Sequence, residues 1–342
     1  IIKKIERVAV SKGLPFLKVE VDLDKIEGSN ILDLVFNLKM GQKLYIERIN
    51  IKGNNQTFDK VIRREFSIIE GDAFNPVMLK KIEEKLRATG FFEKVTIKVA
   101  PGSSSEKAII SVDVIEAPTG SLNFGAGYST DTKLTGSLSL TERNLLGKGQ
   151  KLNLQLSTSR NSNSLNFSFV EPSFLNREVS AGINLSLKQT DPSESTYSSN
   201  SFSLSPSLGF IVGPDSKMNL SYKIESLEIN SENSLSAVLR SDDGHFINSS
   251  ISSSFVFDKR DSMIEPKNGY VLRLKNTLSG IGGDVGYIKN SLRTKFHKSF
   301  LSDELVLSAE IEGGSLQTFT GYSRITDRFK LGGRNLRGFQ FG

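Results

Sequence analysis

Few residues of this chain have types and spacings that could support catalysis or bind a metal. The chain has no cysteine, so thiolate chemistry and disulfide bonds are both excluded. Its two histidines, His245 and His297, have no potential ligands beside them at metal-site spacing. No serine, histidine and aspartate combination forms a recognisable catalytic motif around them. The histidines therefore indicate neither a metal site nor a nucleophilic enzyme.

One short charged cluster could serve acid–base chemistry or hold a metal ion: Asp258, Arg260 and Asp261. Asn268-Gly269 follows shortly afterwards, and asparagine with glycine is typical of turns. We therefore interpret this cluster as a hydrogen-bonded turn. The glycine-rich segment 280–283 is not followed by a helix, so it does not predict a phosphate-binding loop. From these residues we expect no enzyme activity, no cofactor and no metal.

The charge and hydropathy of the chain also limit the classes of partner. The formal net charge is +6 on 342 residues, which is a mild bias. No basic stripe carries interleaved aromatic residues, so we expect no nucleic-acid partner. No stretch approaches the roughly 18–20 apolar residues that a membrane-spanning helix needs.

From about residue 121 onwards, apolar and polar residues alternate in one segment after another. Neighbouring side chains of a strand point to opposite faces, so each of these strands has one apolar and one polar face. The polar positions are mostly Ser, Asn, Gln, Thr, Lys and Arg, which cannot fill a dry core without hydrogen-bond partners. A sheet with an apolar outside and a wet inside is typical of a transmembrane β-barrel. The pattern predicts eleven strands, at 121–129, 133–142, 150–160, 163–171, 177–189, 199–213, 217–229, 247–257, 269–279, 285–298 and 304–313.

The residues before this region have a different pattern. Asn75 suits a helix N-cap with Pro76 in the first turn, and Gly90 suits a helix end. The order strand, helix, helix, strand, strand is predicted at 44–52, 58–66, 74–87, 92–100 and 108–116. A helix at 1–12 and strands at 16–21 and 31–38 repeat the back half of this order. We therefore divide the chain into 1–42, the end of one repeat; 43–117, a complete repeat; and 118–342, the sheet region.

Both ends of the chain suggest a piece of a longer protein. The first repeat lacks its front half, and an eleven-strand barrel would leave unpaired backbone in lipid at several kcal/mol per group. Bacterial single-chain barrels have an even number of strands. Their periplasmic turns are short, and the short connections at 146–149, 172–177, 213–216 and 301–303 lie on the side that the first domain enters. We therefore expect that domain to be periplasmic, with 190–198 and 230–246 on the outside and 258–268 as an unusually long periplasmic connection.

A series of motifs resembles the BamA family of outer-membrane β-barrel assembly factors, in the order of that family and over nearly the whole chain. The matching segments are 51–57, 61–65, 70–72, 90–95, 116–128, 144–149, 171–175, 258–270 and 332–339. The resemblance implies the fold class. We expect an α+β periplasmic POTRA domain of order β-α-α-β-β, followed by an antiparallel transmembrane β-barrel with about eleven of an expected sixteen strands present.

The resemblance also implies roles for three sets of residues. In the first set, Arg337, Gly338 and Phe339 match an Arg-Gly-Phe loop that folds into the barrel lumen, where the arginine would meet a carboxylate. An ordinary exposed loop is the alternative for this segment. We expect Arg337→Ala to impair barrel stability or assembly activity. The second set forms a weakly paired first strand that opens sideways as a lateral gate; it consists of Leu122, Phe124, Gly125, Gly127 and Tyr128.

The third set is expected to dock a periplasmic lipoprotein partner. It consists of Arg63, Arg64, Glu65 and Glu70. A solvated helix face is the alternative here, and a bend near the barrel rim is the alternative for the glycines of the gate strand.

The expected function is insertion and folding of outer-membrane β-barrel proteins, with the gate strand as a template for client strands. The expected partners are periplasmic assembly lipoproteins, unfolded outer-membrane protein clients and the lipid bilayer, and the expected location is the bacterial outer membrane. The main alternative is a transporter of the two-partner-secretion or translocation-module type. A passive porin fits less well, because a simple pore needs no periplasmic repeats.

Overall fold

The structure is a computed structural model of the 342-residue chain. It describes residues 17–25, 32–40, 44–129, 133–191, 197–231, 236–263, 265–301 and 304–329, with the single positions 2, 5, 8, 9 and 234. The chain divides into two compact units: Ile1–Gly120 with Arg143–Gly149, and Ser121–Glu142 with Gln150–Gly342. Among the described residues, no helix is long and apolar enough to cross a membrane.

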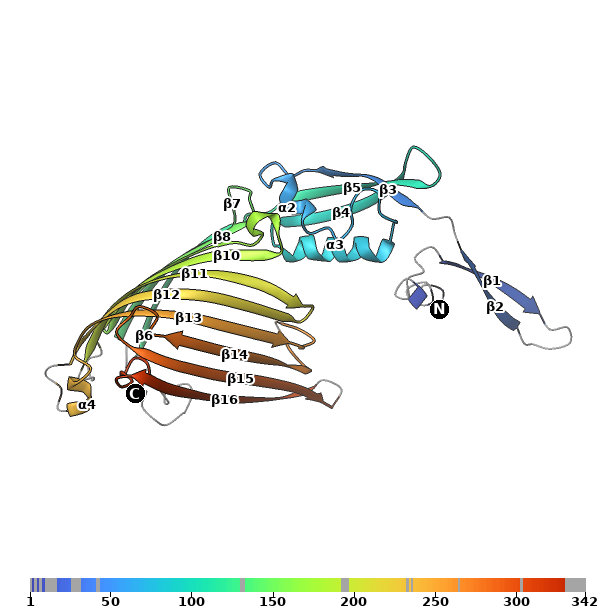
Figure 1. Cartoon of the computed structure of the whole chain (residues 1–342). Coiled ribbons are helices and arrows are strands. Elements are labelled where there is room, and N and C mark those ends of the chain that lie inside the picture. The colour runs from blue at the N-terminus through green and yellow to red at the C-terminus, as the bar shows by residue number, and fades with distance from the viewer. Residues whose placement is uncertain are drawn as a thin grey trace. The chain divides into compact units, whose positions relative to one another are not determined.

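The first unit contains a complete β-α-α-β-β fold, which we call the α+β unit. Its elements are β3 (Tyr45–Lys52), α2 (Asp59–Arg63), α3 (Pro76–Ala88), β4 (Phe92–Pro101) and β5 (Lys107–Glu116). The sheet order is β3-β5-β4, with β5 parallel to β3 and antiparallel to β4. Helix α3 lies along one face of this sheet (Figure 1). The predicted order of elements is therefore confirmed.

The core of the α+β unit follows from side-chain periodicity. Alternate residues of β5 are buried, among them Ile110 and Val112, and they pack with Ile82 and Leu86 of α3. The start of α3 is fixed by Asn75, whose Oδ1 accepts hydrogen bonds from the N–H groups of residues 77 and 78 at 3.0 and 3.4 Å.

Helix α2 is shorter than predicted. The sequence predicts a helix over 58–66, whereas the structure has Asp59–Arg63. The next residues make i→i−3 backbone hydrogen bonds instead. The Glu65 N–H donates to the Ile62 carbonyl, and the Phe66 N–H donates to the Arg63 carbonyl. The last turn is tightened, which is a common way to end a helix.

Ahead of this unit, two strands form a separate hairpin. β1 (Leu17–Lys25) and β2 (Leu32–Met40) pair antiparallel along their full length. The prediction of two strands here is confirmed, with each strand slightly longer than expected. Of the helix predicted at 1–12, positions 2, 5, 8 and 9 are described, and all four are helical.

The second unit is dominated by one curved sheet of eleven strands (Figure 1). The strands are β6 (Gly120–Ser129), β7 (Lys133–Leu145), β8 (Gln150–Ser159), β9 (Ser162–Glu171), β10 (Val179–Thr190), β11 (Ser198–Gly213), β12 (Ser216–Asn230), β13 (Gly244–Asp258), β14 (Gly269–Ser279), β15 (Gly286–Phe300) and β16 (Leu305–Thr320). Each strand neighbours the next one in sequence, and all pairs from β8 to β16 are antiparallel. Strands β6 and β16 form the two edges, so the described sheet is not closed.

The registers give the sheet one apolar and one polar face. Phe167 lies opposite Leu185, and Leu185 lies opposite Leu204, so apolar side chains meet across three strands. In the adjacent pair of the same two strands, Asn166 lies opposite Ser186. The Ser186 hydroxyl donates to Asn166 Oδ1 at 2.8 Å. The polar face therefore supplies hydrogen-bond partners for its own side chains, as the alternation predicts.

Strand β16 is the largest departure from the predicted strand limits. The sequence predicts an end at residue 313. The strand instead continues to Thr320. Gly314 has a packing role, because a Cβ at this position would collide with the Phe329 ring. Cross-strand charge pairing also supports the strand, since Arg293 Nη2 lies 2.7 Å from Glu312 Oε2.

Candidate functional site

Glu116, the last residue of β5, binds the turn that follows β3. Its Oε2 accepts hydrogen bonds from the N–H groups of Asn55 (3.0 Å) and Gln56 (2.9 Å), and its Oε1 accepts one from the N–H of Thr57 (2.6 Å). Partial burial raises the pKa of Glu116, but the bonds from these three residues outweigh burial and hold the pKa below its usual value. The ionised carboxylate is thus the form that this turn requires.

The segment Arg143–Gly149, which follows from the end of β7, packs against the same turn. The Asn144 side chain is buried: Nδ2 donates to Thr57 Oγ1 at 2.9 Å, and Oδ1 accepts from the Gly149 N–H at 2.7 Å. The Phe58 N–H donates to the Gly147 carbonyl at 2.9 Å. Gly147 has a φ of +72°, and a Cβ there would collide with the Gln56 carbonyl oxygen. Glycine is therefore required at this point of the turn.

One more bond connects this turn to the residues just ahead of the first strand of the sheet. The Arg143 N–H donates to the Thr119 carbonyl at 3.2 Å. Thr119 lies in the segment 117–119 between β5 and β6. We call the combination of Glu116, Thr57, Asn144 and Gly147 the junction. Its contacts are hydrogen bonds within the first unit, and they lie directly ahead of β6 in the sequence.

Strand β6 contrasts with the junction. It is an edge of the described sheet, with β7 as its neighbour. Its apolar residues Leu122, Phe124 and Tyr128 are highly exposed, Phe124 to 77% and Tyr128 to 73%. Gly125 and Gly127 lie on the polar face, across from Ser137 and Thr135 of β7. An edge strand offers unpaired backbone groups. Glycines in the interior of a strand weaken its pairing with the neighbouring strand.

The four residues predicted to dock a partner lie on α2 and beside it, and each has a partner within the α+β unit. Arg63 donates from Nε to Asp59 at 2.5 Å and from Nη2 to the Ile49 carbonyl at 3.0 Å. Glu70 accepts from the Ile49 N–H at 3.0 Å and lies 3.6 Å from Arg63. Arg64 pairs with Glu65 at 3.4 Å. The structure thus gives this set structural contacts, and its docking role stays a prediction.

The cluster in the 259–268 connection is a turn network, as the sequence indicates. Arg260 binds Asp258 through two hydrogen bonds of 2.8 and 2.6 Å, and Asp261 accepts from the N–H groups of residues 267 and 268 at 3.0 Å each. Among the described residues, no group of three acidic or histidine side chains could hold a metal ion. His245 and His297 each bond a serine hydroxyl, at 2.8 and 2.9 Å.

Arg337, Gly338 and Phe339 lie outside the described residues. After β16, the structure describes the segment 321–329, which contains a buried arginine. Arg324 is 1% exposed and binds both oxygens of Asp327 at 2.8 and 3.1 Å, with its guanidinium 4.8 Å from the Phe246 ring centre. Asp242, from the connection that carries α4 (Ala237–Arg240), accepts from the Ile325 N–H at 2.8 Å. The segment 321–329 is thus bound to the β12–β13 connection.

The sequence pattern does not predict the roles of Glu116, Asn144 and Arg324. A glycine pair within the segment 144–149 signals a tight turn, but nothing local indicates that Asn144 meets Thr57, 87 positions away. The i,i+3 spacing of Arg324 and Asp327 is a weak signal for an ion pair.

Comparisons with known proteins agree with this architecture. The model of the Omp85 superfamily domain matches residues 144–342, and a POTRA model described as surface antigen variable number repeat matches residues 44–117. The outer membrane protein assembly factor BamA of Neorickettsia risticii is 28% identical over 311 residues, which are 90% of this chain and 42% of that protein. This chain therefore spans less than half the length of that relative.

Two solved structures share the fold. BamA from Haemophilus ducreyi lacking POTRA domains 1–3 superposes with a TM-score of 0.80 at 22% identity, covering 100% of this chain and 68% of that one. CdiB from Acinetobacter baumannii superposes with a TM-score of 0.56 at 14% identity, covering 99% and 63%. The family model covers more than half of the sequence. The chain belongs to the Omp85 superfamily: it is an outer-membrane protein, and its POTRA domain at residues 44–117 is periplasmic.

Proposed function

We propose that this chain is part of the central subunit that inserts and folds β-barrel proteins in the outer membrane, with β6 as the templating strand. Strand β6 is the observation that carries the proposal: it is an exposed, glycine-bearing edge that follows directly from the hydrogen-bonded junction. The relatives named as assembly factors support the same role.

The mechanism requires no covalent chemistry. A client strand that enters lipid must pair its backbone groups, because each unpaired group costs several kcal/mol there. The free edge of β6 offers N–H and C=O groups in strand geometry, so a client strand can pair with it by β-augmentation. The next client strand then pairs with the first, and the client sheet grows outward from β6.

The proposed partners are unfolded outer-membrane proteins and periplasmic assembly lipoproteins, with the lipoproteins docking at Arg63, Arg64, Glu65 and Glu70. Glu70→Gln is a suitable probe, because the glutamine oxygen can still accept from the Ile49 N–H while the charge is removed. We expect weaker lipoprotein binding with unchanged unfolding of the domain. Unchanged binding would assign Glu70 to the stability of the domain alone.

A secretion pore is the second candidate, because the CdiB structure has the same fold. A pore would pass an unfolded chain through the lumen, whereas an insertase leaves a folded barrel in the membrane. The intact protein in lipid vesicles, given an unfolded barrel client on the POTRA side, separates these functions. We expect the client to become protease-resistant and membrane-embedded. Unfolded client inside the vesicles would favour the pore and contradict our proposal.

A further inference from the structure

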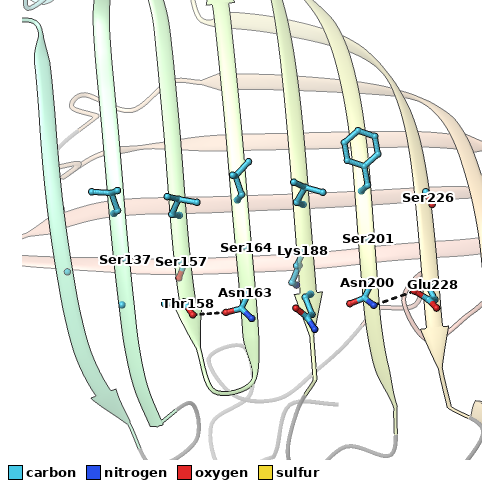
Figure 2. A pocket seen from close by; sticks show the side chains of 18 of the residues that line it. Ser137, Ser157, Thr158, Asn163, Ser164, Lys188, Asn200, Ser201, Ser226 and Glu228 are labelled. Carbon is cyan, nitrogen blue, oxygen red and sulfur yellow. Dashed lines mark hydrogen bonds between the residues drawn. The ribbon is translucent and has the colours of Figure 1, made fainter.

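The apolar face of the large sheet carries a groove that crosses the strands from β6 to β13, with a volume of about 860 Å³. Its apolar wall, which we call the apolar row, consists of Phe124, Leu138, Leu156, Leu165, Leu187 and Phe202. Its opposite wall, the polar row, consists of Thr158, Asn163, Gln189, Asn200, Glu228 and His245. Figure 2 shows part of the polar row beside the apolar side chains.

The strand registers place both rows on one face. Leu165 lies opposite Leu187, and two residues along, Asn163 lies opposite Gln189. Residues two apart on a strand share a face, so the polar row projects in the same direction as the apolar row. The serines between the rows and Lys188 have the other parity and project to the polar face. The backbone of that middle row therefore forms the floor of the groove.

The groove continues a surface that already faces lipid. In this outer-membrane protein the apolar face of the sheet is the face toward the bilayer. The apolar row is part of that face. The polar row lies at the neighbouring strand ends, beside the connections 160–161 and 191–197. Acyl chains can lie against the apolar row while a head group reaches the polar row, so a membrane lipid fits the groove.

The charges of the groove select among lipid head groups. Glu228 is the one charged side chain of the two rows, whereas sites for anionic lipids are built from clustered Lys and Arg. Asn200 Nδ2 donates to Glu228 Oε2 at 3.4 Å, and Thr158 Oγ1 donates to Asn163 Oδ1 at 2.6 Å, as the dashed lines of Figure 2 show. These bonds orient the row, and the exposed Glu228 keeps acceptor capacity for a further donor.

We infer that this groove binds a lipid with a primary ammonium head group, of which ethanolamine is the simplest. The ammonium lies at Glu228, the phosphate of the zwitterion accepts from the side-chain amides of Asn163, Gln189 and Asn200, and the acyl chains lie on the apolar row. The inference rests on the membrane location of the sheet and does not require the proposed assembly function.

Native mass spectrometry of the intact protein, released from detergent micelles, tests this site. The three probes are phosphatidylethanolamine, phosphatidylcholine and phosphatidylglycerol with identical acyl chains. The choline head keeps the positive charge but has no N–H donor, and the glycerol head has hydroxyls but a net negative charge. We expect ethanolamine lipid to be retained roughly fivefold better than either, the factor for one modest ionic hydrogen bond.

Two variants test the groove itself. Glu228→Gln removes the charge with little change in shape and should reduce the preference for ethanolamine lipid to about the level of choline lipid. Gly136→Leu should fill the groove, because a Cβ at Gly136 meets only Thr158 Cγ2, at 3.4 Å. This variant should lower retention of all three lipids.

Glu225→Gln is the matched control, since it changes a carboxylate on the same strand, three residues away and on the opposite face. It should leave lipid retention unchanged, and thermal unfolding confirms that each variant is folded. Equal retention of the three lipids, a preference for the glycerol head, or wild-type retention by both groove variants would overturn the inference.

Discussion

The junction and strand β6 are neighbours in sequence, but they differ in how completely their backbone groups are hydrogen-bonded. At the junction, the carboxylate of Glu116 and the buried amide of Asn144 satisfy backbone groups at distances between 2.6 and 3.0 Å. A few residues later, β6 is an edge with exposed apolar side chains and two glycines on its polar face. Densely hydrogen-bonded backbone therefore precedes β6, whereas β6 itself is an edge of the described sheet.

The proposed templating role would give this difference a physical basis. An edge that moved freely at both ends would lose conformational entropy each time a client paired with it. A fixed starting point reduces that loss, and weak pairing in the strand interior lets the edge exchange partners.

Gly147→Ala should be the most damaging change at the junction. The substitution combines a positive φ with a collision against the Gln56 carbonyl, and we expect a loss of about 2–4 kcal/mol in unfolding free energy. Gly71→Ala is the control, because Gly71 has a φ of +96° with no atom within 4 Å of the added Cβ. Thermal unfolding of the two variants separates the collision from backbone strain. Equal losses would mean that the turn is not packed as described.

Asn144→Ala should have the second largest effect. The substitution removes the bonds that Asn144 makes to Thr57 Oγ1 and to the buried Gly149 N–H. We expect the unfolding free energy to fall by about 2 kcal/mol. A double-mutant cycle with Thr57→Val measures the interaction free energy between the Asn144 and Thr57 side chains. Strictly additive effects would show that the two side chains do not interact.

Glu116 should make the junction sensitive to acid. The folded-state pKa of Glu116 is depressed, so its contribution to stability is present above the ordinary pKa of an unfolded glutamate and is lost as the pH falls through the folded-state pKa. Because solvent screens this half-buried group, we expect roughly 1 kcal/mol or less. Glu116→Gln should remove this part of the pH dependence of unfolding. An identical pH profile for wild type and variant would contradict the role.

Gly125→Ala should change stability least and activity most visibly. The added Cβ meets only Ser137 Oγ, at 2.5 Å, and that hydroxyl can rotate away, so the expected stability change is within about 0.5 kcal/mol. Stronger pairing of β6 with β7 should slow client assembly. Gly182→Ala, against Ser207 in the middle of the sheet, is the matched control. Assembly rates that fall equally in both variants would remove the special role of β6.

Much of the fold could be predicted because it depends on local pattern. Alternation located all eleven strands, since a strand with one face in lipid and one in water must alternate. Asn75 and Pro76 located the start of α3 because capping is a short-range interaction. The end of β16 was missed, because the partner of Gly314 is Phe329, a loop residue that is distant in sequence from the strand interior.

The candidate site was only partly predictable for the same reason. The exposed apolar side chains of β6 follow from alternation, but its neighbour Thr119 meets Arg143 only once β7 has folded back. Asn144 and Thr57 are separated by 87 positions, and Tyr322 bonds the Ser241 carbonyl from 81 positions away. Contacts of this kind depend on the three-dimensional path of the chain, which a single sequence pattern does not encode.

Cysteine cross-linking between β6 and a client strand tests the central claim most directly. The chain has no cysteine, so single substitutions at positions 122, 124, 126 and 128 each introduce one thiol into this part of the protein. In the intact protein stalled with a client, we predict disulfides to one client strand in a continuous register, in which each two-residue step along β6 matches a two-residue step along the client. Cross-links that are absent from β6, or that form with equal yield to central strands such as β10, would contradict the account.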